Sequence, residues 1–118
     1  MRTFAVHPKY RKIKEARSAG ELLASSIFKP DKYPDRRTVE YWEKVSFPFW
    51  FTDILSALDT LYFLGFTINN AQVENALNWL VNRQLDNGLW ALKLLRTKDK
   101  DLPLWIALVI CRIFKNFY

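Results

Sequence analysis

The chain has 118 residues, of which half are hydrophobic, a quarter are charged, and only 3 are Gly and 5 are Pro. This composition is typical of a globular protein and too apolar for a disordered one, so we expect one helical domain over residues 1–118 with one core. The formal net charge is +6. Basic ends could contact phosphates, but there is no zinc-finger spacing and no Arg-rich recognition helix, so nucleic acid is not the expected partner.

The cysteine and hydropathy patterns indicate in which cellular compartment the protein is expected. Cys111 is the only cysteine of the chain, which excludes an intrachain disulfide and favours a reducing interior. The longest uninterrupted apolar run, residues 104–111, has eight residues, whereas a membrane-spanning helix needs about 20. The first ten residues contain no signal-peptide-like stretch. We therefore expect a cytoplasmic protein without a membrane span.

The first predicted helix covers residues 12–28 and ends before Pro30, because a residue that precedes proline leaves helical geometry. One face collects its apolar and small residues, three and four positions apart: Ile13, Ala16, Ala19, Leu22, Leu23 and Ile27. Residues 30–48 are predicted as a loop with one helical turn over residues 38–44. In that turn Thr38 is the expected cap, and Tyr41 and Trp42 are expected to hold the loop on the body.

The second predicted helix runs from about residue 49 to residue 64, with Pro48 in its first turn and Gly65 at its end. Apolar residues go most of the way round this segment, which indicates a central, largely buried helix. Asp53 lies one turn into the prediction. Its carboxylate is favoured there by the helix dipole, which is the structural interpretation of this residue.

The third predicted helix is capped by Asn70 and ends near Gln84. Its apolar face consists of Val73, Ala76, Leu77, Leu80 and Val81. Residues 91–100 show no clear pattern, and a last helix is predicted over residues 102–117 with Pro103 at its start. Four main helices and no convincing hairpin signal predict an all-α fold. Cys111 falls in the last helix, where we expect it to be buried.

The four helices form a repeating pattern. Each of two segments is predicted to contain an amphipathic helix, an irregular loop, and a more apolar helix that Pro and Trp precede or begin. The segments cover residues of about 12–65 and about 70–118. Two tandem α-hairpins are the natural interpretation. Chance similarity between short helices is the alternative.

A motif at the end of the third helix carries a family resemblance. Ala76, Trp79, Leu80, Gln84, Gly88 and Trp90 have the spacing of a glutamine-tryptophan repeat. This motif resembles the repeat of the prenyltransferase, squalene-cyclase and terpene-cyclase superfamily, whose members are (α/α) toroids. The chain departs from that pattern at Asn75, where the family has a basic residue. It also resembles the C-terminal part of uncharacterised prokaryotic toroid-repeat proteins. The resemblance implies a partial toroid, since two hairpins are fewer than a complete one contains.

Physical chemistry gives this motif a structural role. A helix C-terminus leaves carbonyl groups without partners, and the amide of Gln84 is expected to bond there and to the next loop. Gly88 permits the reversal of the chain, and Trp90 is expected to fold back over the helix end. The motif therefore predicts an architecture and not a reaction.

No catalytic, cofactor-binding or metal-binding residue is assigned from the sequence. The acidic cluster that the resemblance would imply for a cyclase is matched only by Asp99 and Asp101, in a polar loop. The zinc ligands that it would imply for a prenyltransferase are missing, because His7 is the only histidine and Cys111 the only cysteine. We lean against an enzyme and leave the question open.

Two functional hypotheses remain. The first is a non-catalytic scaffold or interaction domain, whose partner is a second copy or the remaining part of a larger toroid, because terminal repeats leave apolar faces open. The alternative is binding or conversion of an isoprenoid-like apolar ligand in an aromatic-lined pocket. Trp50, Asp53 and Trp105 are the candidate lining residues. Arg36 and Arg37 could hold an anion there, although adjacent loop charges are usually solvated.

Overall fold

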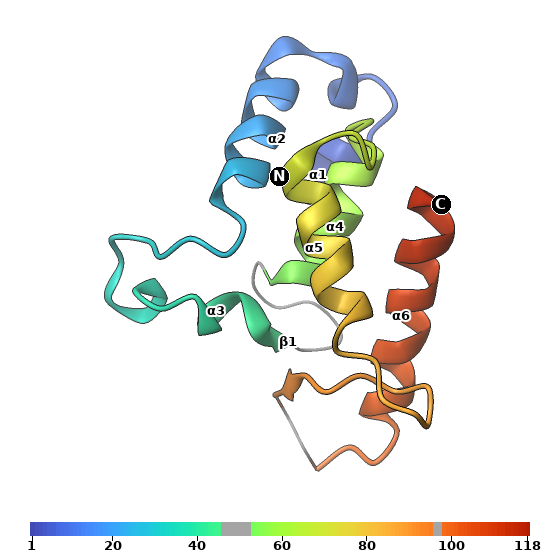
Figure 1. Cartoon of the computed structure of the whole chain (residues 1–118). Helices are drawn as coiled ribbons and strands as arrows, with labels where there is room; N and C mark the ends of the chain where they lie inside the picture. Colours follow the sequence, from blue (N-terminus) through green and yellow to red (C-terminus); the bar gives the residue numbers. More distant parts are fainter. Residues whose placement is uncertain (46–52, 96–97) are drawn as a thin grey trace.

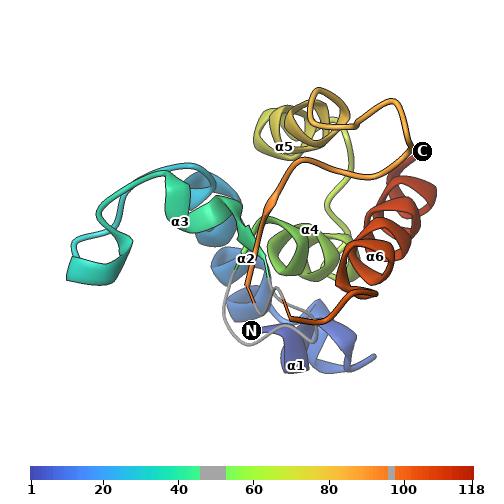
Figure 2. The same ribbon diagram turned by 90° about the horizontal axis from the view of Figure 1, so that it is seen from below.

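The structure is a computed structural model of the whole chain and describes residues 1–45, 53–95 and 98–118. The described part is mostly helical, as predicted. Helix α4, Ile54–Phe63, lies in the centre, and the helices α1, α2, α5 and α6 pack around it (Figures 1 and 2). Every residue of α4 from Ile54 to Leu61 is buried, which confirms the prediction of a central helix. The predicted approach to this helix, including Pro48 and Trp50, lies outside the described residues.

Helix α4 begins later than predicted, at Ile54, with Asp53 as its N-cap. At its other end, the backbone N–H of Gly65 donates to the carbonyl of Tyr62 at 2.9 Å, and that of Phe66 donates to the carbonyl of Leu61 at 3.0 Å. This pair of bonds is the usual way of ending a helix at a glycine. The predicted end is therefore confirmed.

A buried carboxylate in α4 joins three helices. Asp59 is 1 % exposed and is the one charged residue within α4, where Ser56 and Thr60 are also buried. One of its oxygens lies 2.8 Å from the guanidinium of Arg2 in α1, Arg2–Val6. The other accepts a hydrogen bond at 3.1 Å from Arg112 in α6, Leu102–Phe117. Two charge-assisted contacts compensate the lost hydration of the carboxylate, so Asp59 fixes both flanking helices on the centre.

Helix α1 and the turn η1, Tyr10–Lys12, lie in a segment for which the sequence predicts no helix. A helix of five residues is too short to show a periodic pattern. Its stability comes from the tertiary contacts of Arg2 and of Ala5, which is fully buried, since short helices are marginal on their own.

Helix α2, Lys14–Ser26, matches its predicted position and its predicted face except at Leu22. The buried residues are the small ones, Ala16, Gly20 and Ala24, whereas Leu22 is 69 % exposed. Gly20 allows α2 to lie close to the segment that follows α4, because a methyl group in its place would lie 2.7 Å from the ring of Phe66. Leu22 lies on the outer side of α2.

The chain leaves α2 through an unusual backbone conformation. Phe28 has a positive φ of 58°, which costs an L-residue about 1–2 kcal/mol. This conformation places the ring of Phe28 against Trp79 of α5, with 5.2 Å between ring centroids. The aromatic contact between α2 and α5 offsets the strain.

Helix α5, Ala71–Val81, is close to its prediction. The side chain of Asn70 accepts hydrogen bonds from the N–H groups of Gln72 at 3.0 Å and Val73 at 3.2 Å, which confirms the predicted cap. Four of the five predicted core positions are fully buried; Val81 is 51 % exposed and was wrongly placed. It lies in the last turn of the helix, beyond the contact with α4.

The connection between α2 and α4 contains the turn η2, Pro34–Arg36, helix α3, Glu40–Glu43, and strand β1, Lys44–Val45. Trp42 is buried and its indole N–H donates to the carbonyl of Lys29 at 3.1 Å, so it holds the loop as predicted. The N-cap of α3 is Val39 and not Thr38.

Strand β1 pairs in parallel with β2, Lys93–Leu94, which the sequence does not predict. Strands of two residues show no alternation that could be read in advance. The ammonium of Lys93 donates to Glu40 at 2.7 Å, and this hydrogen bond, together with the charge of Lys93, lowers the pKa of Glu40. The pair joins two loops that are about fifty residues apart in the sequence.

Helix α6 has the predicted bounds, with Pro103 in its first turn. Ile106, Val109, Ile110 and Ile113 form its buried side. Among the described residues, no helix is long and apolar enough to cross a membrane.

The contacts of Asp59 predict strong coupling between its two arginines. Arg2→Ala and Arg112→Ala should each lower the free energy of unfolding by about 1 kcal/mol, because the other guanidinium still compensates the carboxylate. The double variant should lose at least about 1 kcal/mol more than the sum. In an Asp59→Asn background this excess should disappear. Urea unfolding measures all of these values.

Glu21→Ala is the matched control, because it removes a surface ion pair with Arg17 and leaves the contact of Arg17 with the Phe66 ring in place. This substitution should change the stability by less than about 0.5 kcal/mol. If the losses of unfolding free energy in Arg2→Ala and Arg112→Ala simply add in the double variant, the burial of the Asp59 carboxylate does not require both arginines.

Candidate functional site

The outer side of α6 presents several exposed apolar side chains on one helix. Helix α6 lies at the edge of the molecule with α4 on its inner side (Figure 2). Leu104 and Leu108 are both 60 % exposed, and Trp105 is 49 % exposed. Cys111, one turn after Leu108, is also exposed, contrary to the prediction of a buried cysteine. We call Leu104, Trp105, Leu108 and Cys111 the α6 outer face.

The α6 outer face is hollowed at its N-terminal end. A shallow cavity of about 260 Å³ lies between Asp101, Leu104, Trp105 and Leu108. Trp105 therefore borders a surface hollow. The sequence places it instead in the lining of an internal aromatic pocket with Trp50, which lies outside the described residues, and Asp53.

Charged residues lie at both ends of the α6 outer face. Asp101 precedes the first turn of α6 and is exposed, and its side chain makes no capping hydrogen bond. Lys115 lies in the last turn and is exposed. Arg112 is on the same side of the helix, but its guanidinium is bound to Asp59. The apolar middle of the face is thus bordered by Asp101, with the exposed Lys100 beside it, at one end and by Lys115 at the other.

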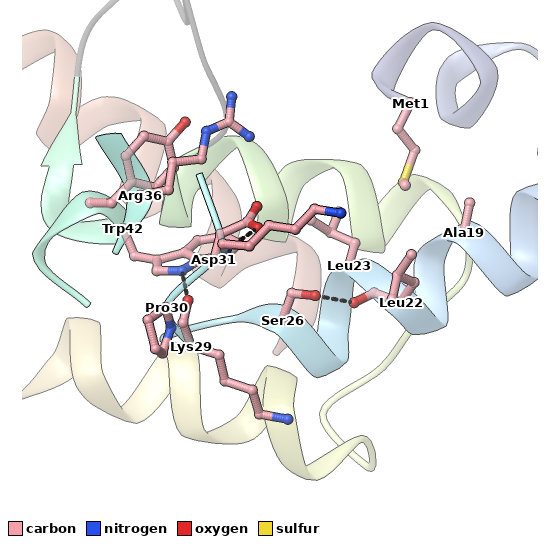
Figure 3. Close-up of a pocket in the computed structure, with 12 residues that line it drawn as sticks. Met1, Ala19, Leu22, Leu23, Ser26, Lys29, Pro30, Asp31, Arg36 and Trp42 are labelled. Atoms are coloured by element: carbon pink, nitrogen blue, oxygen red, sulfur yellow. Dashed lines mark hydrogen bonds between the residues drawn. The ribbon is translucent and has the colours of Figure 1, made fainter. Parts of the chain in front are cut away.

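A second, larger concavity lies between α2, the loop that follows it, and α3. Its volume is about 710 Å³, and its surface is mainly apolar. Figure 3 shows Trp42 and Pro30 on one side of it and Leu22, Leu23 and Ala19 on the other. We call it the α2–α3 pocket. The outward turn of Leu22, a consequence of the small-residue packing of α2, supplies one of its walls.

The polar residues of the α2–α3 pocket are mostly basic. Lys29, Lys32 and Arg36 line it together with one acid, Asp31. The guanidinium of Arg36 lies 5.2 Å from the centre of the Tyr41 ring and 5.7 Å from that of Tyr33. Cation–π contacts of this kind orient a guanidinium. The excess of positive charge favours an anionic group at this rim.

Asp53 has a structural role at the start of α4. It is fully buried, and its carboxylate accepts from the N–H of Ser56 at 2.8 Å while its own N–H donates to the Ser56 hydroxyl at 2.9 Å. This reciprocal pair is a capping box. Asp53 does not border the α2–α3 pocket. The spacing of Asp53 and Ser56 was the signal in the sequence that could have located the helix start.

Trp90 folds back onto the end of α5. Its indole N–H donates to the carbonyl of Leu80 at 2.8 Å, and its backbone forms a β-bridge with Gln84. Gly88 makes the reversal with a φ of 80°, a conformation that favours glycine. The Trp90 ring also lies 6.2 Å from that of Phe114 in α6. Trp90 thus connects the end of α5 to α6.

Other residues of the motif act differently from expectation. The side chain of Gln84 is exposed and makes no hydrogen bond within the described residues, so only its backbone takes part. Arg83, which the sequence did not single out, is the side chain that bonds here. Its guanidinium lies 4.2 Å from the ring centre of Trp79 and donates to Glu43 at 3.2 Å. Ala76 is fully buried against the core.

Metal-ligating side chains do not gather in the described ranges: no three His, Cys, Asp or Glu residues come together there. The ring of His7 accepts from the backbone N–H of Lys9 at 3.2 Å. Asp99 accepts from the backbone N–H of Asp101 at 3.0 Å in the turn before α6. Both groups therefore have local structural contacts.

The contacts of Trp90 predict a loss of stability when it is changed. Trp90→Phe removes the hydrogen bond to Leu80 but keeps the ring, and should cost about 1 kcal/mol. Trp90→Ala also removes the packing on α6 and should cost about 3 kcal/mol. Leu85→Ala is the matched control, because this side chain is 46 % exposed in the turn that Trp90 closes, and should leave the stability nearly unchanged. Urea unfolding tests the series, and a stable Trp90→Ala variant would contradict the structural role.

Comparison of the chain with models of protein families, with curated proteins and with solved structures finds no match.

Proposed function

We propose that this chain is a non-catalytic helical interaction domain that binds a second copy of itself through the α6 outer face. The observation that carries this proposal is the exposure of Leu104, Trp105 and Leu108 side by side on one helix. Single exposed apolar residues are common on proteins, whereas contiguous apolar patches with a polar border mark association sites. Aromatic residues and large aliphatic residues at the centre of such a patch supply most of the binding free energy.

The proposal includes a partial (α/α) toroid of two helix pairs, α2 with α4 and α5 with α6. In its support, α4 packs against α2, α5 and α6, and Trp90 links α5 to α6. In a longer array the next repeat would cover the last helix. A second copy covers it in this proposal. An exposed thiol at Cys111 suits the reducing compartment of a cytoplasmic protein.

Self-association is tested by light scattering over protein concentrations from about 1 to about 300 µM, the range expected for a weak dimer. The mass should rise toward that of a dimer, and Leu108→Glu should keep it at that of the monomer, because a carboxylate would be desolvated in the interface. Leu85→Glu, at a residue that is 46 % exposed in the turn after α5, is the control and should still associate. A monomer at every concentration would reject the proposal.

A second candidate function is supported by the α2–α3 pocket. We propose that it binds an apolar molecule with an anionic head. Its volume of about 710 Å³ is within the range of small-molecule sites, which are mostly apolar with a few polar groups. The apolar walls at Leu22 and Trp42 would receive the chain of such a molecule, and Lys29, Lys32 and Arg36 would face its charge.

This candidate is tested by titrating the tryptophan fluorescence with farnesol and with farnesyl phosphate. Farnesyl phosphate should bind more tightly, by about tenfold, if the basic rim contacts the head group. Leu22→Glu should weaken both by about tenfold or more, because it places a carboxylate in the apolar wall. Val81→Glu, on the surface of α5, is the control. Equal binding to the wild type and to Leu22→Glu would exclude this pocket.

A further inference from the structure

We infer that α6 pairs with α6 of a second copy in the antiparallel direction, about a two-fold axis that passes close to Leu108. This inference rests on the proposed self-association and names its geometry. Asp101 of each copy then lies near Lys115 of the other. Three observations lead to this arrangement: the spacing of the exposed residues, the order of the charges, and the binding of Arg112 to Asp59.

The exposed residues of α6 follow a heptad spacing. Asp101, Leu108 and Lys115 are seven residues apart, which is close to two helical turns, so they lie along one line of the helix. Leu104 and Cys111 fall between them at intervals of three and four residues. This alternation is the pattern by which two helices pack side by side. The buried residues of α6 lie on the opposite side, where they pack against α4.

The order of the charges selects the direction of the pairing. Asp101 and Lys115 are each seven residues from Leu108, on opposite sides of it. An antiparallel pair about Leu108 brings each carboxylate near an ammonium of the other copy, twice in the dimer. A parallel pair would bring carboxylate to carboxylate and ammonium to ammonium. Antiparallel helices also place each helix dipole beside the opposite end of the other. A two-fold axis makes both contacts equivalent.

Arg112 does not compete with Lys115 as the basic partner of Asp101 of the second copy. Its guanidinium is held by the buried carboxylate of Asp59 at 3.1 Å, so its charge already has a partner within the chain. The ammonium of Lys115 is the basic group of α6 beyond it, and the hollow beside Leu104 and Leu108 leaves room for a side chain of the second copy. The other strongly exposed leucines, Leu22 and Leu85, lie on separate elements and form no such line.

The length of α6 sets the expected affinity. A helix of 16 residues is about 24 Å long, and one pair of such helices buries an area at the low end of specific interfaces. We therefore expect a dissociation constant on the order of 10 µM. Charge contacts at the rim of an interface contribute more to its specificity than to its affinity.

Sedimentation equilibrium with charge-reversal variants of the full chain tests the pairing. Asp101→Lys and Lys115→Asp should each weaken the dimer by about tenfold, because each places like charges together at both ends of the interface. The double variant should restore the dimer to within about threefold of the wild type, since it exchanges the two charges. Asp101 makes no capping bond, so these variants should fold, which circular dichroism checks. Glu74→Lys, on the surface of α5, changes the net charge equally and should leave the dimer intact.

The outcomes separate this inference from the proposed function. If Leu108→Glu abolishes the dimer but the single charge reversals do not weaken it, the antiparallel pairing is wrong and self-association through α6 stands. Failure of the double variant to recover also rejects the pairing. If the wild-type chain is a monomer at every concentration, self-association through α6 and its antiparallel geometry are both rejected.

Discussion

The arrangement of the helices depends on a carboxylate that is removed from water in the middle of an apolar helix. Such a group is tolerated only when charged partners replace its hydration. Asp59 receives two, Arg2 and Arg112, from helices at opposite ends of the chain. Both arginines remain about half exposed, so only one of the three charges bears the full cost of burial. This contact holds α1 and α6 against α4 and fixes the rotation of α6 about its own axis.

The rotation of α6 decides which residues face outward. With Arg112 bound to Asp59, and with Ile106 and Ile110 packed in the core, the residues Leu104, Trp105 and Leu108 cannot turn inward. A similar constraint acts on α2. Its small residues pack closely against α4, and the larger Leu22 is left at the mouth of a pocket. The outward side chains of both helices are therefore consequences of how the core is packed, and the loop after α2 completes the pocket.

Local signals in the sequence located helices and their ends well. Asn70 marked the start of α5, Pro103 the start of α6, and Gly65 the end of α4. These signals act within one turn, because a cap or a glycine satisfies backbone groups a few residues away. Prediction failed where contacts are distant. The exposure of Leu22, Val81 and Cys111 depends on neighbouring helices, and α1 and the strands are too short to carry a pattern.

The amino-acid sequence alone therefore determined that the chain is mostly helical, where its longer helices lie, and that α4 is central, because propensity, capping and the breadth of an apolar face are read from neighbouring residues. Only the tertiary structure decided that Asp59 binds two arginines, that Trp90 bonds to Leu80 while the side chain of Gln84 does not, and that an apolar face of α6 stays open. An ion pair between distant residues, or the partner of a helix face, depends on how the helices pack around one another. That packing is set by the shapes of all the facing side chains together.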